Sequence, residues 1–288
     1  MVKLTDLKAG VARVVIAPEL GGGIAHLEVG DRPVLRPWDG DASNPFTLAS
    51  NILAPFSNRI SQGGFDWAGE SHAVEANLTG EAFPIHGDGF QKAWSISQSG
   101  SQAQLMLLNG DIGPWRYRAV QDIELSETAL EIMLTLTNTG PDSLPFGCGF
   151  HPWFPRNAGT RVSFDAKAVW LENEQFLPTQ KLYLRDSAEW CFGTKRPLPA
   201  GWINNTFSNW EGTARIYQNR DAYPCLIQAS ENLSTAIVYS PGKNTNFFCF
   251  EPVSHPVDAF HLSGSPGLKE LAPHQSLKAS MKISWNLE

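Results

Sequence analysis

Two segments far apart in the chain each place a proton-transfer group next to a proline. His151 lies in His151-Pro152-Trp153-Phe154, and Glu251 lies in Phe250-Glu251-Pro252. An imidazole can donate a proton near neutral pH while a nearby carboxylate accepts one. Proline restricts the backbone and so limits how far either side chain can move. The pair predicts an enzyme that works by acid/base chemistry.

The sequence neighbours of both residues are apolar, which makes a charge there expensive. Glu251 follows Phe247-Phe248-Cys249-Phe250, where a carboxylate is costly unless it is paired, hydrogen-bonded or open to a pocket. The alternative is a glutamate that faces water at the end of a strand. His151 stands between Phe150 and Pro152, and such neighbours lower the pKa of an imidazole unless a carboxylate is close. Glu251 is the strongest single candidate in the chain.

Two further polar residues could bind a substrate. His86 lies in Ile85-His86-Gly87-Asp88-Gly89-Phe90, where the glycines permit a turn that would expose the imidazole at a loop edge. The alternative is a hydrogen-bonded structural histidine. Arg59, in Ser57-Asn58-Arg59-Ile60, could be a surface cation or could donate hydrogen bonds to two hydroxyls.

Other common chemistries fit the sequence less well. The candidate metal ligands are His86, His151, His255, His261 and Glu251. They form no HxH pair and no HExxH motif, so we expect no bound metal. No G-x-S-x-G turn presents a serine nucleophile. Hydrolysis by two carboxylates needs a second acid, and the sequence does not choose among Asp88, Asp165 and Asp258.

The composition predicts one large globular domain. The 288 residues are 42% hydrophobic and 11% aromatic, enough for a large core with aromatics left for a binding surface. We expect a single domain over residues 1–288. The net charge of −7 argues against a nucleic-acid partner, which would require surplus lysine and arginine.

The sequence shows no sign of export or membrane insertion. Met1-Val2-Lys3-Leu4-Thr5-Asp6 meets charge too early for a signal peptide, and no apolar run approaches a membrane span. The four cysteines are far apart without a CxxC pair, which predicts reduced thiols. We therefore expect a cytoplasmic monomer or homodimer with no membrane partner, and we interpret Asn77-Leu78-Thr79 as a chance match to a glycosylation site.

Alternating apolar and polar residues predict half-buried strands along most of the chain. The clearest alternations are Leu130, Ile132, Leu134 and Leu136, and then Met281, Ile283, Trp285 and Leu287. Shorter runs predict strands at Val11 to Ile16, Ile24 to Val29, Gln104 to Leu108, Arg118 to Leu125, Ala214 to Gln218 and Thr235 to Tyr239. This pattern is typical of an antiparallel sandwich.

Five segments depart from the strand pattern. Leu48 to Pro55 and Gly267 to Leu271 look helical. Pro141 to Gly159 predicts a packed functional loop, and Arg185 to Ser208 predicts long surface connections. Gly21-Gly22-Gly23 precedes an expected strand rather than a helix, so it predicts a tight turn and not a phosphate-binding loop.

Taken in order, the motifs resemble those of the aldose 1-epimerase (galactose mutarotase) family across almost the whole chain. Ser57-Asn58-Arg59-Ile60 looks like the family's NRI segment, and Ile85-His86-Gly87 looks like its HG segment. Phe150-His151-Pro152-Trp153-Phe154 is similar to its HPYF-type segment, and Phe250-Glu251-Pro252 to the strand with its catalytic glutamate. Each motif is short, but their order and wide spacing are together fairly specific.

The resemblance implies an all-β fold, a large antiparallel β-sandwich with very little helix and a sugar cleft. It implies that Glu251 is a general base, that His151 is a general acid, and that His86 and Arg59 hold the sugar. The family commonly has an aspartate before an aromatic residue, where this chain has Ile203-Asn204-Asn205-Thr206-Phe207. Asn204 would thus replace a charged acceptor of sugar hydroxyls.

The implied reaction opens the ring of a free aldose and closes it again as the other anomer, which requires no cofactor. Trp153 and Phe154 are candidates to stack on the C–H surface of the sugar. Two alternatives stay open. One is a hexose-6-phosphate 1-epimerase, for which Arg59, Arg116 and Arg118 are the available cations. The other is a non-catalytic sugar-binding protein on the same fold.

Overall fold

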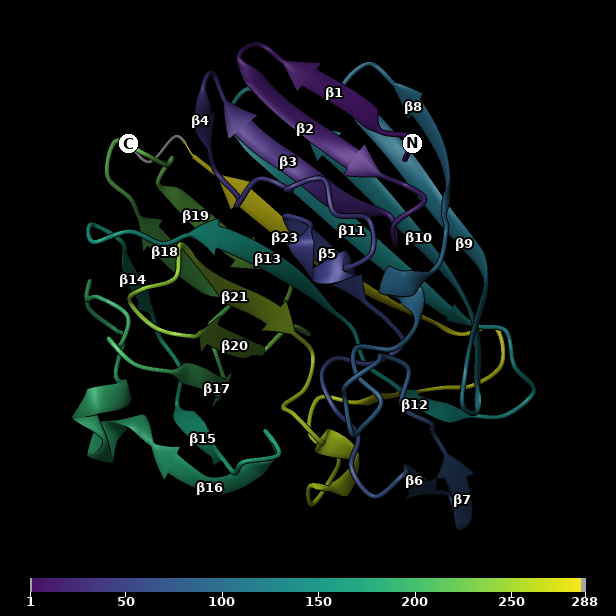
Figure 1. The fold of residues 1–288 in the computed structure, drawn as a ribbon. Helices are drawn as coiled ribbons and strands as arrows, with labels where there is room; N and C mark the ends of the chain where they lie inside the picture. Colours follow the sequence, from purple (N-terminus) through teal and green to yellow (C-terminus); the bar gives the residue numbers. More distant parts are fainter. Residues whose placement is uncertain (1, 286–288) are drawn as a thin grey trace.

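Two large antiparallel sheets build the protein, and the computed structural model describes residues 2–285 of it. Figure 1 shows the 11-stranded sheet lying over the 8-stranded sheet. The order in the first sheet is β1 (Thr5–Ala9), β2 (Ala12–Ala17), β3 (Gly23–Val29), β5 (Ser50–Leu53), β13 (Gly149–Pro155), β21 (Phe247–Val253), β20 (Thr235–Ser240), β17 (Ile203–Ser208), β15 (Ala168–Glu172) and β16 (Pro178–Tyr183), with β4 (Arg32–Pro33) paired to β3. The order in the second is β14 (Arg161–Phe164), β18 (Thr213–Tyr217), β19 (Cys225–Ala229), β23 (Ser276–Ser284), β11 (Ala129–Asn138), β10 (Trp115–Leu125), β9 (Gln102–Ile112) and β8 (Ser95–Ser99).

The remaining elements are small. Two small antiparallel sheets flank the large ones: the hairpin of β6 (Gly64–Trp67) with β7 (Glu70–Ala73), and the long-range pair of β12 (Leu144–Phe146) with β22 (Lys269–Leu271). Within residues 2–285 the helical segments are five 3₁₀ turns: η1 (Pro45–Thr47), η2 (Gly89–Gln91), η3 (Leu184–Asp186), η4 (Ala188–Trp190) and η5 (Ala259–His261). In the same range no helix has the length and apolar character needed to cross a membrane. The predicted antiparallel sandwich with very little helix is confirmed.

The core lies between the two sheets and is built by alternation along each strand. In β10, Trp115, Tyr117 and Ala119 are buried in the core, and the arginines between them, Arg116 and Arg118, are exposed. Successive side chains of a strand point to opposite faces, so every second residue reaches the core. Each large apolar side chain buried in this way stabilises the fold by roughly 1.5–3 kcal/mol.

The central strands β13 and β21 are buried on both faces. Phe150 and Phe154 of β13 pack in the core, as do Phe248 and Phe250 of β21. Alternate residues, namely His151 and Trp153 of β13 and Cys249 and Glu251 of β21, point to the other face of the sheet, where Phe46 of η1 packs against His151 and Trp153. This double burial explains why the sequence of both strands is so apolar.

Both helical predictions are wrong. Ser50–Leu53 is strand β5, whose four residues are all buried and which pairs with β13. A strand covered on both faces has a continuous apolar pattern that a short helix can also show. Lys269–Leu271 is strand β22, preceded by a turn at Gly267, whose φ of +78° and close approach to the Ser254 carbonyl suit glycine alone.

The two predicted connecting segments also contain strands. Most of Pro141 to Gly159 is β12 and β13, and the stretch from Arg185 to Ser208 ends in the buried strand β17. The glycine turn is confirmed between β2 and β3, where a Cβ on Gly21 would lie 2.1 Å from the Phe90 carbonyl oxygen. Leu287, predicted on the last strand, lies outside the described residues. The single domain stays a prediction.

Candidate active site

A cavity of about 290 Å³ opens on the face of the 11-stranded sheet that points away from the core. Its lining residues are Phe46, Asn58, Arg59, Glu81, Ile85, His86, His151, Trp153, Phe176, Trp202, Asn204, Tyr239 and Glu251. All six residues predicted for the site belong to this set. The structure therefore brings together residues that the sequence scatters over nearly two hundred positions.

The register of β13 and β21 places His151 and Glu251 face to face. The neighbouring pairs are Gly149 with Val253 and Trp153 with Cys249. His151 and Glu251 lie midway between these pairs, on the same face of the sheet. Nε2 of His151 is 3.3 Å from Oε1 of Glu251, and the residues are only 5% and 2% exposed. Two adjacent strands thus bring an imidazole and a carboxyl group close enough to exchange a proton.

Burial decides where this pair holds its proton. It raises the pKa of Glu251 to about 8, against the opposing charge of Arg59. It lowers the pKa of His151 to about 3, and the charge of Arg36 acts in the same direction. Between these pKa values the pair holds one proton, and burial favours the uncharged arrangement with that proton on Glu251. The resemblance implied that the proton lies on His151. Because both groups are removed from water, the proton instead favours Glu251.

Two atoms of the pair have no hydrogen-bond partner among the described residues. They are Nδ1 of His151 and Oε2 of Glu251. Buried polar atoms in proteins are nearly always hydrogen-bonded, and the exceptions often have a catalytic role.

His86 is held as a neutral hydrogen-bond donor. Its Nδ1 accepts the backbone N–H of Asn58 at 3.0 Å, which leaves the proton of the neutral ring on Nε2. Burial lowers the pKa of His86 well below its usual value, and the charge of His151 adds to this effect. Gly87 permits the turn, since a Cβ there would lie 1.9 Å from the Ala54 carbonyl oxygen. The predicted exposed histidine is thus a buried one that lines the cavity.

Arg59 is restrained by a carboxylate that the sequence analysis did not single out. Its guanidinium donates to both oxygens of Glu81 at 2.8–3.0 Å and lies 4.9 Å from the ring centroid of Phe176. Its Nη1 also donates to Oδ1 of Asn58. A bidentate pair of this kind fixes the orientation of the guanidinium at the cavity wall.

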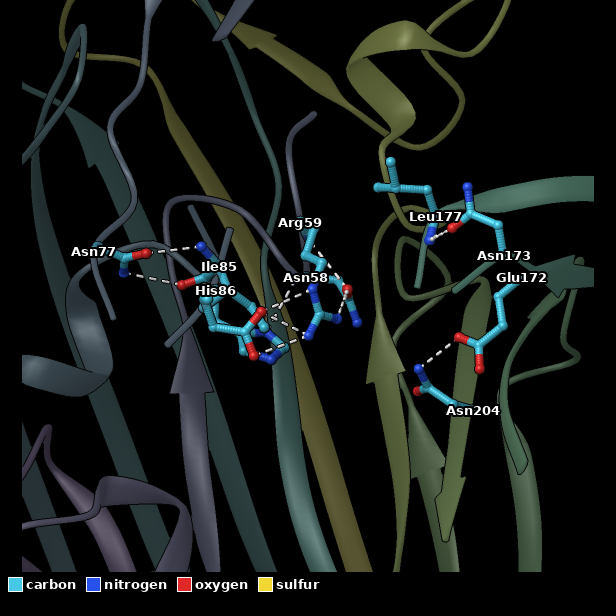
Figure 2. A network of polar contacts seen from close by, with 10 residues as sticks. Asn58, Arg59, Asn77, Ile85, His86, Glu172, Asn173, Leu177 and Asn204 are labelled. Atoms are coloured by element: carbon cyan, nitrogen blue, oxygen red, sulfur yellow. Dashed lines mark hydrogen bonds and ion pairs between the residues drawn. The ribbon is translucent and has the colours of Figure 1, made fainter. Parts of the chain in front are cut away.

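Asn77 holds the segment that carries His86. Its side chain accepts the Ile85 N–H at 2.7 Å and donates to the carbonyls of Ile85 and Gly87, as Figure 2 shows in part. The amide is thus occupied with backbone groups inside the fold. No local sequence pattern marks this role, because its partners lie eight or more positions away.

Asn204 reaches the cavity from β17, and Glu172 at the end of β15 anchors it. Nδ2 of Asn204 donates to Oε2 of Glu172 at 2.7 Å (Figure 2), and Nε1 of Trp202 donates to Oε1 at 2.7 Å. Burial raises the pKa of Glu172, while these two hydrogen bonds and the charge of Arg59 oppose the rise.

One of the two aromatic candidates, Trp153, lines the cavity. The ring of Trp153 stacks on His151 at 4.9 Å with an interplanar angle of 20°, and the guanidinium of Arg36 lies 4.2 Å from the indole. Phe154 is instead fully buried and stacks on Phe248 in the core, because adjacent strand residues face opposite sides. The sequence analysis missed the other aromatic wall residues, Phe46, Phe176, Trp202 and Tyr239.

Several residues considered from the sequence lie elsewhere. Arg116 and Arg118 are exposed on β10 in the other sheet, and Arg116 pairs with Asp111 at 2.7 Å. His255 accepts the Ser57 N–H at 3.0 Å and has a structural role. Asp88, a candidate second acid, accepts the hydroxyl of Tyr117. The proposed cluster of Arg59 with Arg116 and Arg118 is therefore wrong.

Among residues 2–285, one group of side chains at and beneath the cavity wall could ligate a metal. Single ligand atoms of His151, Cys249 and Glu251 lie within 4.8 Å of one another. Burial raises the pKa of Cys249 well above its usual value and that of Glu251 to about 8, so both ligands would have to lose a proton to bind a cation. The donor set fits a proton-transfer pair beside a neutral thiol better than a metal centre.

Fold and cavity together define a galactose mutarotase-like sandwich with a pocket for a small polar molecule. The structure superposes on a putative aldose 1-epimerase from Escherichia coli K12 with a TM-score of 0.92, 30% identity and 99% of each chain covered. It also matches a galactose mutarotase-like protein from Clostridium acetobutylicum with a TM-score of 0.85 and 18% identity, over 98% of this chain and 94% of that one.

The sequence comparisons agree. The family model described as aldose 1-epimerase matches residues 3–284. The uncharacterised protein YphB of Escherichia coli is 32% identical over 282 residues, which cover 92% of this chain and 93% of YphB. The chain belongs to the aldose 1-epimerase family.

Proposed function

We propose that the protein is an aldose 1-epimerase that interconverts the α and β anomers of a free monosaccharide. The observation that carries this proposal is the 3.3 Å approach of His151 to Glu251 inside a cavity with aromatic and hydrogen-bonding walls. A volume of about 290 Å³ is near the lower end of the roughly 300–1,000 Å³ typical of small-molecule sites, which suits one sugar ring.

In the proposed reaction the carboxylate of Glu251 removes the proton from the anomeric hydroxyl. The C1–O1 bond becomes a carbonyl, the bond from C1 to the ring oxygen breaks, and His151 donates its proton to that oxygen. Rotation about C1–C2 presents the other face of the aldehyde, and the reverse proton transfers close the ring. Acid and base groups placed in this way each contribute roughly 10²–10⁴-fold to a rate.

The reaction needs one proton on the pair, and the pair holds one at neutral pH. Burial favours that proton on Glu251, so the active arrangement requires its transfer to His151 across 3.3 Å. Sugar hydroxyls beside the pair supply polar contacts that stabilise the charged arrangement. The protons are the transferred groups, so the proposed chemistry requires no cofactor.

The remaining wall residues would orient the sugar. His86 offers an Nε2–H donor, Arg59 offers a fixed guanidinium, and Asn204 offers an amide. Trp153 would stack on the C–H face of the ring, as aromatic side chains do in many small-molecule sites. These assignments stay predictions, as does the cytoplasmic location.

The cavity favours a free sugar over a phosphorylated one. Arg59 is already paired with Glu81, and Glu172 contributes a second carboxylate close enough to affect the same region. A phosphate would meet these negative charges, and among the described residues that line the cavity the one arginine, Arg59, is already paired. This observation argues against the hexose-6-phosphate alternative.

Polarimetry of freshly dissolved single anomers tests the proposal directly. Glucose, galactose, xylose, arabinose, fucose and a hexose 6-phosphate would each be followed with and without protein. Faster approach to anomeric equilibrium for at least one free aldose supports the proposal. Sugar binding without any acceleration would favour the non-catalytic alternative.

A further inference from the structure

Glu172 sits behind the cavity wall and contacts two of the residues that form it. Its two carboxylate oxygens accept from the indole N–H of Trp202 and from the amide of Asn204, both at 2.7 Å. Trp202 and Asn204 line the cavity, whereas Glu172 is not among the lining residues. Figure 2 shows Glu172 above Asn204, across from the group formed by Arg59 and His86.

This contact determines the polarity that Asn204 presents to the cavity. A side-chain amide can turn either its N–H₂ group or its carbonyl oxygen toward a neighbour. An ionised carboxylate accepts hydrogen bonds and cannot donate them. Glu172 therefore draws the N–H₂ group of Asn204 toward itself and leaves Oδ1 on the opposite side of the amide.

We propose that Glu172 is a positioning residue that makes Asn204 an acceptor for a hydroxyl of the sugar. Asn204 stands where the resemblance leads one to expect an aspartate, and an aspartate would accept from any direction without help. With Glu172 behind it, the asparagine offers the same acceptor without a second charge in the cavity. This inference rests on the proposed function, since it names how the sugar is held.

The charges near Glu172 support its ionised form in this role. Burial raises the pKa of Glu172, while the hydrogen bonds donated by Trp202 and Asn204 and the nearby guanidinium of Arg59 oppose that rise and favour the charged carboxylate. Hydrogen bonds to an ionised group are stronger than those between neutral groups. The ionised form of Glu172 thus holds the N–H₂ group of Asn204 toward itself.

Exchanging donor and acceptor between the two positions tests the proposal. In Glu172→Gln the new amide can still accept from Trp202 while its N–H₂ group faces Asn204, so the Asn204 amide turns and presents a donor to the sugar. We expect KM to rise about tenfold with kcat within about twofold, as for loss of one oriented hydrogen bond. In Asn204→Asp two carboxylates meet, and KM should rise by a similar factor.

The double variant carrying both substitutions restores the pairing with reversed polarity. The N–H₂ group of the glutamine donates to one aspartate oxygen, and the other oxygen faces the sugar. KM should return to within about threefold of the wild-type value, so the two changes are strongly non-additive. Glu174→Gln removes a charge from an exposed residue two positions away and serves as the matched control.

The readouts are steady-state KM and kcat by polarimetry together with sugar affinity by isothermal titration calorimetry. An unchanged KM in Glu172→Gln overturns the proposal. A double variant whose KM rises by the product of the two single-variant factors also overturns it. If the wild-type protein binds sugars but does not accelerate anomer exchange, only the proposed function is refuted. The role of Glu172 is then tested by comparing the sugar Kd of the same variants. Wild-type protein that binds none of the sugars overturns both.

Discussion

Replacing Glu251 by glutamine should remove activity and raise stability at the same time. Glutamine has the shape of the protonated glutamate that burial favours, but it cannot take a proton from the anomeric hydroxyl. Loss of one positioned base costs roughly 10²–10⁴-fold. We therefore expect catalysed mutarotation to fall at least about a hundredfold, with sugar binding largely kept.

The stability gain follows from the raised pKa of Glu251. A carboxyl with a pKa of 4.5 when unfolded and about 8 when folded binds more protons in the native state, so its contribution to stability falls as pH rises between these values. At pH 7 this costs about 3 kcal/mol, from about 1.4 kcal/mol per pH unit above 4.5. Glu251→Gln removes that cost, and Tm should rise by several degrees.

The assay is polarimetry on the best sugar of the panel, combined with thermal unfolding at pH 5 and pH 7. The gain in Tm should be larger at pH 7, because the wild-type penalty is larger there. Glu174→Gln, which removes an exposed carboxylate, should change neither quantity. A near-normal rate in Glu251→Gln would refute the role of Glu251 as the base.

The remaining predictions concern the pair and the segment that carries His86. The activity of the wild-type protein should be level around neutral pH and should fall above about pH 8, where the His151–Glu251 pair loses its proton, and again toward pH 3. Measurement of kcat against pH checks this profile. A rate that still rises at pH 9 would contradict the assignment of the pair. His86→Ala should raise KM about tenfold, and it should destabilise the fold by about 1–3 kcal/mol because the Asn58 N–H loses its buried acceptor. Steady-state kinetics measures the change in KM, and urea unfolding measures the loss of stability. An unchanged KM would remove His86 from the site. Gly87→Ala should destabilise by more than about 1 kcal/mol in urea unfolding, since φ is +68° and the new Cβ would overlap the Ala54 carbonyl; a neutral effect would mean that the turn can shift.

The sequence by itself determined the strands with regular alternation, and it singled out His151 and Glu251. Alternation in segments such as Leu130 to Leu136 is a local property, and it predicts a strand wherever one face meets the core. Glu251 stood out because a carboxylate is rare in so apolar a run. Five of the six predicted site residues were proposed from short motifs and Asn204 from a departure from one, and all six line the same cavity.

Tertiary structure decided the features that depend on distant neighbours. Ser50–Leu53 is a strand because β3 and β13 flank it, which no local pattern reveals. Arg59 is paired because Glu81 lies beside it in space, and Asn204 is oriented because Glu172 lies behind it. The protonation of the His151–Glu251 pair depends on burial on both sides of the sheet, and burial is set by the packing of the whole chain.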